Sequence, residues 1–202
     1  MTKEGSVYDY PLELGFKIAT IGTRVRITDA TGQLIAYVRK KKFRIKEDVG
    51  IYADEDQRKL LFRIKADRAW DFGAKYSISD SNGKVLGAVR REGVRSIWKS
   101  SYALSDATGS GIGSIHEENP MVKVLDSMLE SLPLGDALGG LFFNPAYLAD
   151  LRGRTVLRIK KERSVFEGQF SVEKLGEFSE EEEEELLLAS LIMMVLLERD
   201  RG

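Results

Sequence analysis

Clustered lysine and arginine side chains are the residues of this chain whose spacing most clearly suggests a chemistry. Three basic runs stand at the ends of predicted strands, and cations of this kind bind phosphate groups and acidic membrane surfaces, each contributing about 1 kcal/mol. Convergence of the runs at one end of the fold would create a lipid-headgroup site; the alternative is a solvated strand face with interleaved acidic partners. The headgroup candidates are Arg39, Lys40, Lys41, Lys42, Arg44, Arg90, Arg91, Arg95, Lys160 and Lys161.

Residues suited to catalysis are sparse. His116 is the only histidine, so a Ser-His-Asp triad or a histidine-based metal site would have to use it, and its place before Glu-Glu-Asn-Pro favours a polar loop residue. The glycine-rich segment 109–113 lacks the lysine of a phosphate-binding loop, and we interpret it as tight hairpin packing. We therefore expect no enzyme activity, no catalytic residues and no cofactor, with an unrecognised enzyme as the minor alternative.

Acidic residues offer one candidate metal loop. Asp54, Glu55 and Asp56 are consecutive, but the D-x-D-x-D-G spacing and the glutamate at the twelfth position of a calcium loop are missing. A hairpin turn is the favoured interpretation, and we expect no metal site.

Composition narrows the class of protein. The 31 basic and 32 acidic residues nearly cancel, which argues against nucleic acid as a partner. The absence of cysteine excludes disulfides, thiolate catalysis and palmitoylation. No apolar segment follows Met1, so we expect a cytoplasmic protein.

A repeated hairpin is the element that must position these side chains. Four short stretches alternate polar with apolar residues, reach an aspartate, turn, and return as another strand. The aspartates Asp29, Asp54, Asp80 and Asp106 are 25, 26 and 26 residues apart, and a glycine follows three residues later in every copy except that of Asp54. Asp accepts hydrogen bonds from turn N–H groups and Gly supplies a positive φ, so the sequence predicts four related hairpins between about residues 24 and 116.

Further elements follow the hairpins along the chain. Alternating cationic and apolar residues predict connecting strands at 42–46 and 95–100, and residues 121–132 have apolar positions three and four apart, which predicts a short helix ending at Pro133. Strands are expected again at 155–160 and 164–172.

The C-terminal segment predicts a helix that is apolar around its whole circumference. Residues 186–197 form twelve positions interrupted only by Ser190, and six glutamates precede them. At about 1.5 Å per residue the run covers roughly 18 Å, which is short for a bilayer core, so the helix must be enclosed by protein. We expect Ser179 and Glu182 to form a capping box and the glutamates to be a solvated first turn or two. The predicted buried residues are Leu187, Leu188, Leu191, Ile192, Met194 and Val195.

Together, the Asp-x-x-Gly hairpins, the strand pair within 156–172 and the acidic-then-apolar helix 180–197 resemble the LURP-one-related and phospholipid scramblase families. The resemblance implies the tubby C-terminal-like fold, a mainly β architecture in which a closed, roughly twelve-stranded antiparallel barrel encloses a C-terminal helix. It implies one domain over residues 12–202 after an N-terminal arm, 1–11. Scramblase-like proteins usually have a proline-rich N-terminal segment and a palmitoylated cysteine cluster, whereas this chain has four prolines and no cysteine.

The same resemblance implies a function. We expect a non-enzymatic, peripheral lipid- or phosphoinositide-binding module whose partner is an anionic phospholipid or membrane surface, which would extend its cytoplasmic location to the membrane periphery. The alternative is a soluble interaction or regulatory scaffold that binds unknown protein partners and no lipid.

Overall fold

In the computed structural model, the chain is described over residues 6–19, 22–41, 48–68, 73–92, 101–118, 146–162 and 168–199, without the side chains of 17–19, 40–41 and 198–199. The predicted helix at 121–132 and the predicted connecting strands at 42–46 and 95–100 lie outside the described residues.

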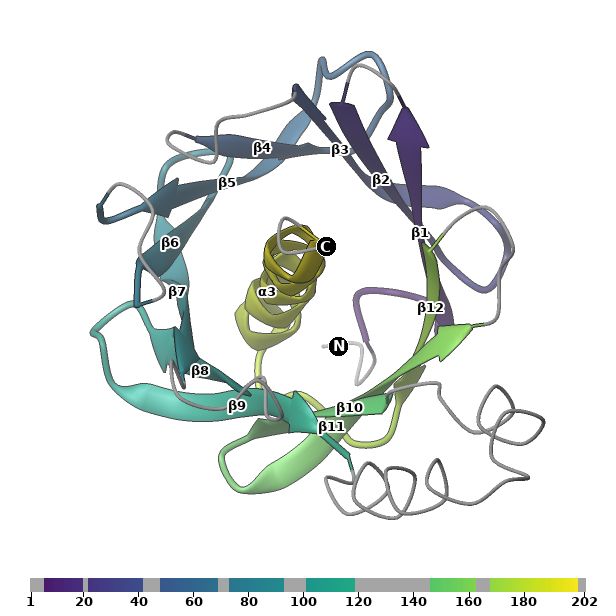
Figure 1. Ribbon diagram of the computed structural model, residues 1–202. Helices are drawn as coiled ribbons and strands as arrows, with labels where there is room; N and C mark the ends of the chain where they lie inside the picture. The colour runs from purple at the N-terminus through teal and green to yellow at the C-terminus, as the bar shows by residue number, and fades with distance from the viewer. Residues whose placement is uncertain are drawn as a thin grey trace, which may run out of the picture.

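Twelve antiparallel strands of the described residues form one closed barrel (Figure 1), as the resemblance implied. Each strand pairs with its neighbours in the chain, and β1 closes the barrel against β12, with Leu12 opposite Val172. The strands are β1 (Leu12–Ala19), β2 (Gly22–Thr28), β3 (Leu34–Lys41), β4 (Val49–Tyr52), β5 (Leu60–Ala66), β6 (Lys75–Asp80), β7 (Val85–Glu92), β8 (Ser101–Asp106), β9 (Gly111–Glu117), β10 (Ala146–Leu151), β11 (Arg154–Glu162) and β12 (Gly168–Lys174).

Alternating side chains explain why these segments form barrel strands. Val25 and Ile27 on β2, like Phe62 and Ile64 on β5, are buried, while the residues between them are exposed. Successive side chains of a strand point to opposite faces, so one set fills the barrel and the other meets solvent. The four predicted hairpins are confirmed as β2–β3, β4–β5, β6–β7 and β8–β9.

Two strands were missed from the sequence, β1 and β10. β10 carries the buried alternation Tyr147, Ala149, Leu151 and enters a two-residue turn in which Arg152 and Gly153 have φ of 49° and 77°. Two positive φ values in succession are typical of a tight β-hairpin. The Arg-Gly pair was therefore a usable signal for a fifth hairpin, β10–β11.

The aspartate turns have the predicted chemistry. Asp106 Oδ1 accepts hydrogen bonds from the backbone N–H groups of Thr108 (2.9 Å) and Ser110 (3.0 Å) and from the Thr108 hydroxyl (2.7 Å), and this hydroxyl is the main reason that the pKa of Asp106 lies below its ordinary value. Gly109 follows with φ +88°. The Asp54 turn, which lacks glycine, instead places Gln57 at φ 60°.

Helix α3 (Glu181–Arg199) lies inside the barrel (Figure 1), which confirms the enclosed-helix prediction. All six predicted residues are buried: Leu187, Leu188, Leu191, Ile192, Met194 and Val195. The one polar residue of the apolar run, Ser190, is fully buried, and its hydroxyl donates to the Leu186 carbonyl at 2.7 Å. The hydroxyl is thus satisfied within the helix itself, and the helix can be surrounded by apolar side chains on every side.

A glycine on β7 marks the place where α3 approaches the barrel wall most closely among the described glycines. A Cβ atom at Gly87 would lie 2.2 Å from the Ser105 carbonyl oxygen and 2.7 Å from a methyl group of Leu186. No real side chain tolerates such contacts, so the wall needs glycine at this position.

Candidate functional site

The three strands that carry the described parts of the basic runs end at the same rim of the barrel. Strands β3, β7 and β11 run in the same direction because neighbouring strands are antiparallel, and in the closed order three other strands separate each from the next. The last residues of these strands, Lys41, Glu92 and Glu162, therefore lie spaced around one rim, which we call the basic rim. The four aspartate turns and the start of α3 lie at the opposite end, which we call the mouth.

The cations of the basic rim differ in their exposure and in whether they pair with a carboxylate. The side chains of Arg39 and Lys161 are exposed, and in the described part of the chain neither has a carboxylate partner. Arg90 is also exposed and pairs with Glu92, Nη2 to Oε1, at 3.3 Å. These three side chains are the described candidates that are presented to solvent.

Two other candidates contribute to the barrel itself. The Lys160 ammonium lies 2.8 Å from Glu173 on β12, and both side chains are roughly one-third exposed. The Arg91 guanidinium lies over the ring of the fully buried Tyr102, 5.9 Å from its centroid, in a cation–π contact. The side chains of Lys40 and Lys41, and the residues Lys42, Arg44 and Arg95, lie outside what the structure describes.

At the mouth, three successive glutamates of α3 are held by three different elements. Glu182 contacts the Lys84 ammonium of the β6–β7 turn, Glu183 accepts from Arg152 Nε of the β10–β11 turn at 2.7 Å, and Glu184 bonds to the N-terminal arm. Successive helical residues point about 100° apart, so the three contacts fix the rotation of the helix.

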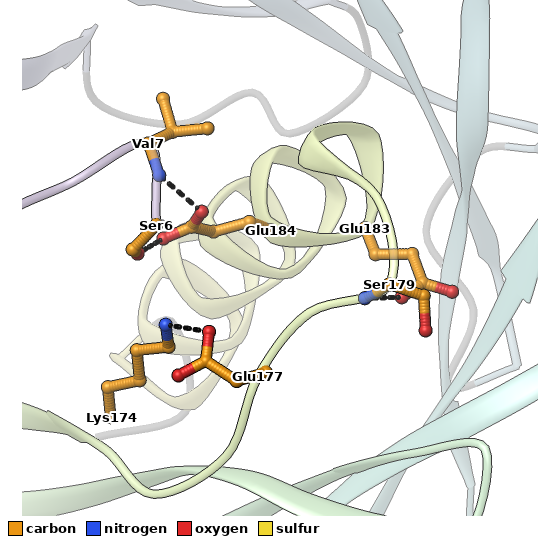
Figure 2. A network of polar contacts seen from close by, with 7 residues as sticks. All are labelled: Ser6, Val7, Lys174, Glu177, Ser179, Glu183 and Glu184. Carbon is orange, nitrogen blue, oxygen red and sulfur yellow. Dashed lines mark hydrogen bonds and ion pairs between the residues drawn. The ribbon is translucent and has the colours of Figure 1, made fainter. Parts of the chain in front are cut away.

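Glu184 is the most deeply buried of these carboxylates, with 2% of its surface exposed. The Ser6 hydroxyl donates to one of its oxygens and the Val7 N–H to the other at 2.7 Å (Figure 2). Asp9 continues the arm, and its carbonyl accepts from Ala30 N–H in the β2–β3 turn at 3.0 Å. The arm is therefore fastened both to the helix and to the barrel.

The prediction that the glutamate run is solvated was wrong for Glu183 and Glu184. Only 6% of Glu183 is exposed, because Arg152 and the Ser179 N–H hold its carboxylate. Figure 2 shows the contact with Ser179. The capping contact was also misplaced by one residue: the Ser179 N–H donates to Glu183 at 3.1 Å, whereas Glu182 pairs with Lys84. The donors come from remote turns and the arm, so the local sequence gave no sign of them.

Burial and negative charge shape the pKa values at the mouth. Burial, and then its neighbours Glu181 and Glu182, raise the pKa of Glu185 above its ordinary value. The pKa values of Tyr8 and Tyr10 are also raised, chiefly by burial and then by nearby glutamates. Both tyrosines therefore stay neutral, and the Tyr10 side chain forms a hydrogen bond with Glu184.

The arm contact predicts a measurable stability effect. Ser6→Ala should lower the free energy of unfolding by about 1.5–3 kcal/mol, the usual contribution of a hydrogen bond to a charged group. Urea denaturation measures it, and the same substitution in a Glu184→Gln background should cost clearly less. An equal loss in both backgrounds would contradict the contact.

The remaining candidates for chemistry lie on strands and turns of the barrel. His116 Nδ1 lies 3.7 Å from Asp150 Oδ2, and that aspartate also accepts from the Thr155 hydroxyl at 2.7 Å. Gly113 is confirmed as a packing glycine, because a Cβ there would lie 2.0 Å from the Asp150 carbonyl oxygen. Asp54 accepts from the N–H groups of Arg58 and Lys59, as a turn residue does. Among the described residues, no group of three or more acidic or histidine side chains could hold a metal ion.

The fold defines a class of protein: a closed antiparallel β-barrel filled by its own C-terminal helix. The family model described as LURP-one-related matches residues 34–128, the region of the repeated hairpins that carried the resemblance. No curated protein and no solved structure matched the chain. In the part of the chain that the structure describes, no helix combines the length and apolarity needed to span a membrane.

Proposed function

We propose that this LURP-one-related chain is a non-enzymatic, peripheral lipid-binding module, similar in that respect to scramblase-like and tubby-like proteins. The observation that supports the proposal is that β3, β7 and β11, the strands that carry the described cations of the three basic runs, end at one rim. Cations arranged around a rim can meet a flat anionic surface together, and each contributes about 1 kcal/mol. The ligand is the headgroup layer of an acidic membrane, including phosphoinositides.

Vesicle binding tests the proposal directly. The purified protein is sedimented with phosphatidylcholine vesicles containing phosphatidylserine or a phosphoinositide, across a salt series and with calcium or a chelator. We expect binding that weakens steeply as salt rises, because salt screens the attraction between exposed charges. Absence of binding to every acidic vesicle at low salt would contradict the proposal.

Charge reversal assigns the binding to the rim. Replacing Lys40, Lys41 and Lys42 together by glutamate should weaken vesicle binding by about a hundredfold or more, since about 3 kcal/mol of attraction is lost. Arg58→Glu with Lys59→Glu is the matched control, because both side chains are exposed at the mouth, opposite the rim. Equal weakening by the two variants would indicate nonspecific charge attraction.

A soluble interaction scaffold is the second candidate function. It is favoured by the acidic partners of Arg90 and Lys160 and by the pairing of Arg158 with Glu118 at 2.8 Å, which neutralise part of the rim. Under this alternative the rim variant would still bind protein partners, and vesicles would not sediment the protein under any condition.

A further inference from the structure

A groove of about 440 Å³ lies on the outer wall of the barrel along β6, and the proposed lipid-binding rim does not account for it. It begins at the β6–β7 turn, at the mouth end. Its floor is low because the outward residues of β6 are serines: Ser79 stands opposite Arg63 on β5, and Ser77 stands opposite Lys65. The residues that matter for its chemistry are Arg63, Lys65, Ser77, Ser79, Asn82 and Val85.

The two cations of the groove converge on a single anionic atom. Asp48 Oδ2 lies 3.1 Å from Arg63 Nη1 and 3.7 Å from Lys65 Nζ. Arg63 and Lys65 are two residues apart on one strand, so both side chains leave the same face. About half of the Arg63 side chain and somewhat more of Lys65 remain exposed, so an incoming anion can reach both.

Hydrogen-bond donors line the floor beside these cations. Within the described residues the Ser77 hydroxyl has no partner, and the Ser79 hydroxyl has only a long 3.5 Å contact with the Arg63 carbonyl. Asp80, the acidic residue of the lining, is committed to its turn, where it accepts from the N–H groups of Asn82 (2.9 Å) and Lys84 (2.8 Å). The opposite margin is apolar, because 43% of Val85 is exposed.

We propose that this groove binds a phosphomonoester group attached to a small, partly apolar body, with Asp48 as a built-in competitor. A phosphate dianion has enough acceptor oxygens for the guanidinium fork, the ammonium and both serine hydroxyls at once. Asp48 occupies the cations with one oxygen and releases them when the phosphate enters. The attached body lies against Val85.

Calorimetric titration with glycerol 3-phosphate tests the site, with glycerol as the uncharged control. Arg63→Ala should weaken binding about tenfold or more, because a charge-assisted donor pair is lost. Asp48→Asn should strengthen binding, since it removes the competitor and one negative charge, a result that a merely structural role of Asp48 would not produce. Lys75→Ala is the matched control: Lys75 is an exposed cation on β6 outside the groove, and its removal should leave binding unchanged.

Vesicles of phosphatidylcholine with phosphatidic acid distinguish the source of the phosphate. If the groove binds the phosphate of a lipid, Arg63→Ala should weaken vesicle binding. If the ligand is soluble, Arg63→Ala should weaken only the binding of glycerol 3-phosphate. Either result supports the site. The rim variant at Lys40–Lys42 should leave glycerol 3-phosphate binding intact, so failure of the rim proposal leaves this one standing. Absence of glycerol 3-phosphate binding, or equal weakening by Arg63→Ala and Lys75→Ala, overturns the proposal.

Discussion

Met193→Asp should prevent the protein from folding. Met193 is fully buried in α3 at the centre of the barrel, and its neighbours Ile192 and Met194 are buried as well. Among the described residues no cation is buried in the core, so a carboxylate there would lack a partner, and burying an unpaired charge costs several kcal/mol even after relaxation. The whole free energy of unfolding of a domain is about 5–15 kcal/mol, so one such substitution removes a large share of it or all of it. Leu191→Asp should act in the same way.

Circular dichroism and urea denaturation measure the effect, and two controls isolate its cause. Met193→Leu conserves volume and should cost less than about 1.5 kcal/mol. Leu175→Asp also replaces an apolar residue by aspartate, but Leu175 lies before α3 and is 54% exposed. It should change the free energy of unfolding by no more than about 0.5 kcal/mol. Cooperative unfolding of Met193→Asp at an unchanged urea midpoint would show that the helix is not enclosed.

Removing the chain after Phe178 should leave a barrel that cannot stay folded. The deletion takes away the whole of α3, whose large apolar side chains are almost completely buried. Burial of each such side chain stabilises the fold by about 1.5–3 kcal/mol, so their combined loss exceeds the net stability of any ordinary domain. Inward-facing residues such as Ile51, Ile78 and Ile115 would line an empty interior. We expect aggregation or a collapsed state that binds a hydrophobic dye.

A cleaved form of the intact protein is the matched control for that deletion. A protease site placed in the exposed linker between β12 and α3, at Leu175, would cut the chain and leave every residue present. If burial holds the helix, the two fragments should elute together and keep the barrel's circular dichroism spectrum. Separation of the fragments without loss of structure would contradict a stabilising role of α3.

Local patterns accounted for much of the fold. The Asp-x-x-Gly turns were predictable because the aspartate and the glycine each satisfy a need within a few residues, as the Asp106 turn shows. Residues 186–197 are apolar around the whole helix, so the sequence predicted that protein surrounds this helix, whatever the architecture of the rest. β1 was missed although its buried Leu12 and Leu14 flank the exposed Glu13 and although it pairs with the adjacent β2 as well as with β12. β10 was missed because Arg-Gly was not recognised as a turn.

The candidate sites were less predictable, because their geometry joins distant parts of the chain. The sequence identified the basic runs, but only the closed barrel shows that β3, β7 and β11, which carry their described cations, end at one rim. The groove at Arg63 was not found, since its hollow depends on the register that sets Ser77 and Ser79 beside Lys65 and Arg63. Asp48, which pairs with both Arg63 and Lys65, lies just before β4, outside the strand pair β5–β6 that carries these residues.

Sequence patterns were enough to predict the four repeated hairpins, the positions of their turns and the burial of the last helix, because period, turn chemistry and apolarity act between residues close in the chain. Only the tertiary structure decided what surrounds that helix and how Glu182, Glu183 and Glu184 are neutralised by Lys84, Arg152 and the arm. Barrel closure decided these contacts, because burial of a charge is tolerated only where remote donors are brought to it.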